Sequence, residues 1–307
     1  MGRWFQARSY PRPGLTGKGW QATAPPRTAT LPPLMPFLEA NGLTFHTQTL
    51  GSGQPVVMIH GMFFGNLAAW YFHTAPELAK HHEVFMYDTR GHGKSTRPET
   101  GYDLATMTSD LNALVESYGN TPLDIVGHSY GALTALRFAL DQPQRVRRLA
   151  LIELPLPPHR LAETEDLLPF TSAQMKEIFQ ADELRSRLSQ REDSEEILDS
   201  LPESVRGSLL HGKRGIQRIA RNLRYLLSDS SLIPDLRAEK DIPDEELAEL
   251  SCPVLCIYGD ESKLRGVGDR LERVLPNPTL IELKGGHYLL NERAPEVTAA
   301  LDDFLKD

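Results

Sequence analysis

Short apolar runs alternate with helix-like stretches along most of the chain, and this order restricts the possible folds more than any other feature. The run Val-Val-Met-Ile at 56–59 holds no polar residue, which is typical of a strand covered on both faces. Strands are expected at 43–50, 56–60, 84–88, 123–127, 146–153, 253–258 and 279–283. Helices are expected at 67–81, 104–118, 131–141 and 269–275, with a closing helix from about 294. This alternation predicts an α/β fold with a mostly parallel, doubly wound sheet and helices on both of its faces.

The composition divides the 307-residue chain into a leader, a core and an insertion. Residues 1–34 hold five basic side chains, no acidic one and six prolines, so we expect a disordered leader, or a segment upstream of a working start at Met35. The prolines also argue against an amphipathic transit peptide. Residues 156–250 interrupt the strand rhythm with 13 basic and 20 acidic residues, which favours a solvated helical lid. We therefore expect a core at 35–155 and 251–307, with the lid at 156–250 inserted between its two parts.

Charge and hydropathy exclude several classes of protein. The chain carries 33 basic and 41 acidic residues, a formal charge of −8, which argues against a general nucleic-acid binder. No stretch approaches about 18 consecutive apolar residues, so we expect no membrane span and interpret the chain as cytoplasmic. Cys252 and Cys256 fall in one expected strand, whose extended backbone holds them about 13 Å apart, too far for a disulfide. We interpret both as small apolar residues, and we make no prediction of the oligomeric state.

The strongest chemical signal is Gly127-His128-Ser129-Tyr130-Gly131, because this G-x-S-x-G pattern lies between an expected strand and an expected helix. A sharp strand-to-helix turn forces an unusual backbone conformation on the serine, and the flanking glycines leave room for it. The turn lifts the hydroxyl above the sheet edge and places the next N–H group at the start of a helix. The pattern therefore predicts a serine nucleophile rather than a plain glycine-rich turn.

Three further motifs surround this turn in a fixed order. They are His60-Gly61-Met62, the segment Asp-Thr-Arg-Gly-His-Gly-Lys-Ser at 88–95, and Gly286-His287. Together with the Ser129 turn, they make the chain from 35 to 307 resemble the α/β-hydrolase superfamily. A serine hydroxyl needs an adjacent base, and the resemblance implies that His287 is that base. It also implies that the backbone N–H groups of Met62 and Tyr130 bind the oxyanion, that His60 holds the loop in place, and that no metal or organic cofactor takes part.

The sequence leaves open which carboxylate orients His287. In most of the family the acid lies three residues after a glycine, as G-x-x-D, but in the run Gly-Asp-Glu-Ser at 259–262 that position is Ser262. A reshaped loop would let Asp260 or Glu261 take the role. Some relatives, certain haloalkane dehalogenases among them, instead carry a glutamate just after the strand that follows the elbow, and Glu153 resembles that residue. Glu153, Asp260 and Glu261 all stay candidates in this order, beside a purely structural role for Glu153.

Two groups of residues suggest how a substrate is held, and each also has a simpler interpretation. A series of cations in the expected lid has helical spacing and would grip an anionic substrate, although it is equally typical of a solvated helix face. Its members are Lys213, Arg214, Arg218, Arg221 and Arg224. Apolar residues beside the oxyanion loop would form a pocket for an acyl chain, or would simply belong to the core. They are Met62, Phe63, Phe64 and Trp70.

The expected reaction is hydrolysis of a small carboxylic ester or thioester through an acyl-enzyme intermediate. Ser129 argues against a dehalogenase or an epoxide hydrolase, because both need a carboxylate nucleophile. A carbon–carbon bond hydrolase of ring-cleavage products and a cofactor-free haloperoxidase-type enzyme share the same motifs, so both stay open. A non-catalytic ligand-binding protein on this scaffold also stays open, because the G-x-x-D acid is missing.

Overall fold

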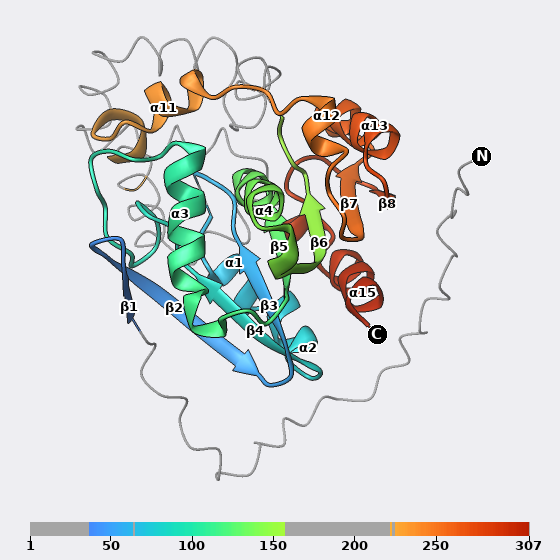
Figure 1. Cartoon of the computed structure of the whole chain (residues 1–307), viewed down its shortest axis with the longest axis horizontal. Helices are drawn as coiled ribbons and strands as arrows, with labels where there is room; N and C mark the ends of the chain where they lie inside the picture. Colours follow the sequence, from blue (N-terminus) through green and yellow to red (C-terminus); the bar gives the residue numbers. More distant parts are fainter. Residues whose placement is uncertain (1–36, 64, 157–221, 223–224, 307) are drawn as a thin grey trace, which may run out of the picture. The chain divides into compact units, whose positions relative to one another are not determined.

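The computed structural model describes residues 37–63, 65–156, 222 and 225–306, and the sheet lies within a unit that spans Met35–Asp307. In the described part, eight strands form one sheet in the order β1-β2-β4-β3-β5-β6-β7-β8. The strands are β1 (Phe37–Ala40), β2 (Leu43–Gly51), β3 (Gln54–Ile59), β4 (His82–Tyr87), β5 (Leu123–His128), β6 (Val146–Ile152), β7 (Val254–Gly259) and β8 (Pro278–Leu283). β1 and β2 pair antiparallel at one edge and the other strands are parallel, so the predicted mostly parallel α/β sheet is confirmed. Figure 1 shows β1 and β2 in blue at one edge of this sheet and β7 and β8 in orange at the other.

Both faces of the sheet are covered by helices, which explains the unbroken apolar run of β3. Val57 and Ile59 pack into one apolar cluster, whereas Val56 and Met58 pack into another, because successive side chains of a strand point to opposite faces. The first cluster includes residues of α3 (Leu104–Leu114), α4 (Tyr130–Asp141), α12 (Asp244–Leu247) and α13 (Arg265–Val274). The second includes residues of α1 (Ala68–Tyr71), α2 (Thr74–Leu78), α14 (Leu289–Glu292) and α15 (Ala294–Leu305).

Some elements differ from the prediction for local reasons. The helix expected at 67–81 is two short helices, α1 and α2, because His73 between them has a non-helical backbone with φ −129°. The helix expected at 104–118 begins after Asp103, whose carboxylate caps it by accepting from the N–H of Thr106 (2.9 Å), and α3 ends at Leu114 before a 3₁₀ turn, η1 (Glu116–Tyr118). β1 was not expected because its four mostly exposed residues carry no alternating apolar pattern.

Most of the expected lid lies outside the described residues. Apart from Leu156, the structure describes only its last part, which includes α11 (Leu232–Ala238) and α12. The five cations at 213–224 and Phe64 also lie outside the described residues, so the lid, its proposed basic face and the domain boundaries stay predictions. None of the helices in the described part is long and apolar enough to cross a membrane.

Candidate active site

Ser129 lies in the tight turn between β5 and α4. Its backbone has φ 54° and ψ −126°, a left-handed conformation that residues other than glycine rarely adopt. A Cβ atom at Gly127 would lie 2.4 Å from the backbone of α4, and one at Gly131 would lie 2.5 Å from the carbonyl oxygen of His60. The two glycines of the pattern are therefore required for the close approach of β3, β5 and α4 around the serine.

His287 lies between β8 and α14, and the fold brings it to Ser129 although 158 residues separate them. The Nε2 atom of His287 is 3.0 Å from the Oγ atom of Ser129, which is hydrogen-bond distance. The Nδ1 atom is 3.1 Å from a carboxylate oxygen of Glu153. An ionised carboxylate only accepts hydrogen bonds, so the proton of a neutral His287 belongs on Nδ1, and Nε2 is left to accept from the serine hydroxyl.

Glu153 directly follows β6 and is fully buried. Its backbone also has a positive φ of 52°, and its N–H donates to the carbonyl of Ile257 in the neighbouring strand β7 (2.9 Å). The Oε1 atom accepts from the N–H of Gly259 (2.6 Å), and Oε2 accepts from the hydroxyl of Ser262 (2.5 Å) as well as facing His287. These donors offset the cost of burying a carboxylate, and they hold the side chain in one orientation.

Asp260 and Glu261, the other two candidates for the acid, directly follow β7. The Oδ1 atom of Asp260 accepts from the N–H of Gly285 (3.0 Å). The backbone N–H of Glu261 donates to the carbonyl oxygen of Gly285 (3.0 Å). Both side chains are exposed. The carboxylate that contacts His287 is thus that of Glu153, while Asp260 holds the loop that carries His287.

The loop after β3 packs directly against the serine. A Cβ atom at Gly61 would lie 3.0 Å from the Cβ of Ser129, so a side chain at this position would crowd the serine. His60 holds the loop: its Nδ1–H donates to the carbonyl of Gly61 (2.8 Å), and its Nε2 accepts from the N–H of Thr89 (3.0 Å). Burial lowers the pKa of His60, which keeps it neutral in this role. Met62, the residue after Gly61, is one of the two expected oxyanion donors.

Tyr130, the other expected oxyanion donor, is the first residue of α4 and follows the serine directly. Its side chain is buried, and its hydroxyl donates to the carbonyl of Tyr102 (3.2 Å) and lies 3.2 Å from Oε1 of Glu239. The start of α4 is therefore fixed to the segment that follows α11. Backbone N–H groups at the start of a helix point outward along a favourable dipole, as an oxyanion requires.

His128 has a role that the sequence analysis did not assign. It is nine-tenths buried, its Nε2–H donates to the backbone carbonyl of His287 (3.0 Å), and the two rings lie 5.1 Å apart. Burial, with a smaller effect from the neighbouring His287, lowers the pKa of His128 to about 3. A neutral His128 holds the backbone of His287 without placing a second positive charge beside it. Its place directly before Ser129 in the G-x-S-x-G pattern is the sequence feature from which this role could have been suspected.

The segment 88–95 is structural. The carboxylate of Asp88 accepts from the N–H groups of Leu67 (2.7 Å) and Lys94 (2.9 Å), and it lies 2.6 Å from Nδ1 of His46. Trp70, one of the residues considered for an acyl pocket, lies in α1 and is fully buried in the apolar cluster that also includes residues of α15. In the described part of the chain, no group of three or more side chains is arranged to hold a metal ion.

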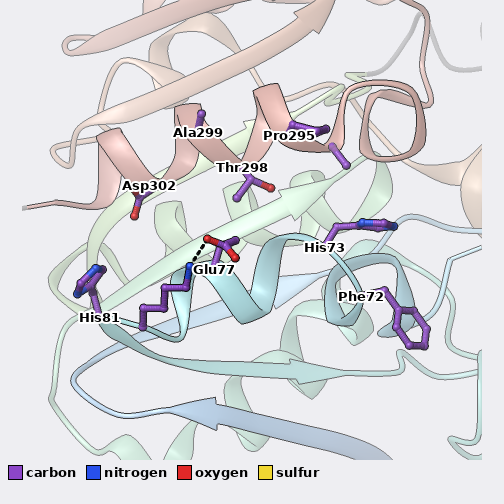
Figure 2. A pocket seen from close by; sticks show the side chains of 10 residues that line it. Phe72, His73, Glu77, His81, Pro295, Thr298, Ala299 and Asp302 are labelled. Atoms are coloured by element: carbon purple, nitrogen blue, oxygen red, sulfur yellow. Dashed lines mark hydrogen bonds and ion pairs between the residues drawn. The ribbon is translucent and has the colours of Figure 1, made fainter. Parts of the chain in front are cut away.

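A separate groove of about 600 Å³ lies between α2 and α15. Figure 2 shows His73, which precedes α2, and His81, which lies between α2 and β4, on the side opposite Thr298 and Asp302 of α15. Glu77, which also lines the groove, forms an exposed ion pair with Lys80. Neither Ser129 nor the residues in contact with it line this groove, so it is distinct from the site around the serine.

Comparisons with known proteins identify the fold family of the chain. The chain matches the family described as alpha/beta hydrolase fold over residues 54–294. It is 24% identical over 268 residues to 2-(acetamidomethylene)succinate hydrolase of Mesorhizobium japonicum, covering 86% of this chain and 92% of that protein. It is 36% identical over 116 residues to soluble epoxide hydrolase of Corynebacterium sp., covering 37% of this chain but only 39% of that relative. The enol-lactonase of Burkholderia xenovorans LB400 superposes with a TM-score of 0.67 at 19% identity, covering 89% of this chain and 100% of that one. Because the family match spans most of the sequence, the chain belongs to the α/β-hydrolase fold family.

Proposed function

We propose that this α/β hydrolase is a serine hydrolase that cleaves a carboxylic ester or thioester through an acyl-enzyme intermediate. The observation that carries the proposal is one continuous series of contacts. It runs from Ser129 Oγ to His287 Nε2 (3.0 Å) and from His287 Nδ1 to Glu153 Oε2 (3.1 Å). Nucleophile, base and orienting carboxylate in this order form the constellation that acyl transfer requires.

Each group has a definite step. Ser129 Oγ attacks the carbonyl carbon of the substrate while its proton moves to His287 Nε2, and the backbone N–H groups of Met62 and Tyr130 hold the oxyanion. His287 then gives the proton to the departing alcohol or thiol. A water molecule then attacks the acyl carbonyl carbon while His287 takes its proton. The bond between the acyl carbon and Ser129 Oγ breaks, His287 returns the proton to Oγ, and the carboxylic acid leaves. Throughout, Glu153 keeps the imidazole oriented and stabilises the imidazolium.

The nucleophile separates this proposal from the chemistry of one relative. The similarity to soluble epoxide hydrolase covers 116 residues. Opening an epoxide by an alkyl-enzyme ester needs a carboxylate nucleophile, whereas this chain has a serine at the elbow. Acyl chemistry at a carbonyl is what a serine, a histidine and a carboxylate can perform together.

Labelling with a fluorophosphonate probe tests the nucleophile. We expect rapid adduct formation on the wild-type chain and none on Ser129→Ala. Thermal melting would check that the variant is folded. Absence of labelling on the folded wild type under mild conditions would contradict the proposal and favour a non-catalytic ligand-binding protein.

A substrate panel tests the bond that is cleaved. The panel contains p-nitrophenyl esters of graded acyl length, acyl-CoA thioesters, 2-(acetamidomethylene)succinate and a ring-fission dienoate. We expect Ser129-dependent release of acid from the esters or thioesters. Turnover of the dienoate alone would assign carbon–carbon bond hydrolysis instead, and turnover of the succinate derivative alone would assign cleavage of an acyl–nitrogen bond.

A further inference from the structure

We propose that Ser262 is a positioning residue for the reaction, because it holds the carboxylate of Glu153 against His287. This inference rests on the proposed function and adds a fourth side chain to the series that begins at Ser129. Its basis is that one carboxylate oxygen, Oε2 of Glu153, lies 2.5 Å from the Ser262 hydroxyl and 3.1 Å from His287 Nδ1.

The turn after β7 fixes the direction of the Ser262 hydroxyl. The backbone N–H of Ser262 donates to the carbonyl of Gly259 (3.1 Å), and its Oγ accepts from the N–H of Leu264 (3.1 Å). The bond from Leu264 uses a lone pair of the Ser262 oxygen and not its proton. A hydroxyl has one proton to donate, and here Glu153 accepts it. Ser262 is also nine-tenths buried, so water competes little for this proton.

The carboxylate of Glu153 depends on the last residue of β7 and on the turn after it for two of its donors. Gly259 N–H donates to Oε1 and Ser262 O–H donates to Oε2, so both oxygens are fixed independently of His287. With Gly259 alone, the carboxylate could rotate about its last side-chain bond and move Oε2 away from the imidazole. A fully buried carboxylate that loses a donor also loses part of the compensation for its charge.

The same geometry places position 262 close enough to supply the carboxylate itself. Ser262 Oγ is within one hydrogen bond of the oxygen that contacts His287 Nδ1. A side chain that is longer by one atom and carries two oxygens would extend toward that nitrogen. We therefore expect Ser262→Asp to restore a carboxylate to the series when Glu153 is neutralised.

The first experiment is a double-mutant cycle on the best ester of the panel. We expect Ser262→Ala to lower kcat by roughly 10–100-fold with little change in KM, because misplacing a catalytic group by about 1 Å has an effect of this size. Ser262→Thr, which keeps the hydroxyl, should retain most of the activity. When Glu153→Gln is already present, Ser262→Ala should lower kcat by less than about twofold further, because the carboxylate that it positions is gone. Ser251→Ala, at an exposed serine just before β7, is the matched control and should equal the wild type.

The second experiment is the transfer of the acid. The double variant Glu153→Gln/Ser262→Asp should regain at least about tenfold in kcat over Glu153→Gln alone, because it returns a carboxylate to within reach of His287. Wild-type kcat in folded Ser262→Ala, or equal fold-losses from Ser262→Ala with and without Glu153→Gln, would overturn the inference while leaving the proposed function intact. A folded wild type without any Ser129-dependent reactivity would overturn both.

Discussion

Ser129 and Glu153 leave neighbouring parallel strands with almost the same positive φ, 54° and 52°, a range that residues other than glycine rarely adopt. Each is the first residue after its strand, β5 or β6, and the last residues of the two strands, His128 and Ile152, are paired in register. Ser129 N–H also donates to the carbonyl of Ile152 (2.9 Å). Two residues with a strained positive φ thus follow the carboxyl ends of these two strands, and the side chain of His287 contacts both of theirs.

Exchanging the two candidate carboxylates for amides should distinguish them. Glu153→Gln removes the charge that faces His287 Nδ1. We expect kcat to fall by about 10³–10⁴-fold, the effect of replacing the acid of such a triad by an amide. Asp260→Asn keeps an oxygen that can accept from Gly285 N–H and should lower kcat by less than about threefold, since a loop contact of an exposed group contributes little. Steady-state kinetics on both folded variants is the measurement. Equal losses would contradict the assignment of Glu153.

Adding one methyl group at Gly131 should destabilise the protein. The new Cβ would lie 2.5 Å from the carbonyl oxygens of Ile59 and His60. We expect Gly131→Ala to lower the free energy of unfolding by about 1–3 kcal/mol, since backbone atoms must shift to make room. Gly266→Ala is the matched control: nothing lies within 4 Å of its Cβ position in α13, and the change should raise stability by about 0.5–1 kcal/mol. Urea denaturation measures the free energy of unfolding of both variants. If that of Gly131→Ala equalled the wild-type value, the conclusion that position 131 has no room for a side chain would be wrong.

Two buried histidines should make the folded state sensitive to acid. Burial lowers the pKa of His92 and of His128 to about 3, from an ordinary value of 6.5. Between these values the unfolded chain binds protons that the folded chain does not, so the free energy of unfolding rises with pH. The stabilisation is complete above about pH 6.5 and is lost progressively as pH falls toward about 3.

Urea midpoints measured at about pH 7.5 and about pH 5 check this sign. We expect the lower midpoint at the lower pH. The difference should shrink in His92→Asn, which can still donate to the carbonyl of Arg90, and in His128→Gln, which can still donate to the carbonyl of His287. A pH dependence unchanged by both substitutions would show that other groups cause it.

The two cysteines should be inert in the folded protein. Both are free and buried, and burial raises the pKa of Cys252 to about 11 and that of Cys256 to about 12. Because the thiolate is the reactive form, a disulfide reagent at about pH 8 should modify neither thiol until denaturant is added. In denaturant, two thiols should react in the wild type and one in Cys252→Ala. Fast labelling of the native wild type would contradict the burial of both.

The order of elements could be predicted because it depends on local patterns. The apolar run of β3 indicates a strand covered on both faces, and G-x-S-x-G between a strand and a helix indicates a turn that only small residues permit. β1 and the break between α1 and α2 could not be predicted. β1 exists because β2 pairs with it, and the break at His73 follows from a backbone conformation that no pattern in the sequence marks.

The candidate acid shows most clearly which features of the site the sequence determines and which depend on the tertiary structure. By itself, the sequence determined the fold, the position of Ser129 and His287 in their motifs, and a set of three carboxylates near strand ends. Only the tertiary structure decided that Glu153 contacts His287, across 134 residues, and that Asp260 contacts the backbone of Gly285. The physical reason is that local patterns specify the backbone of each element, whereas the direction of a side chain at a strand end depends on the register of β6 with β7 and on donors from the next turn.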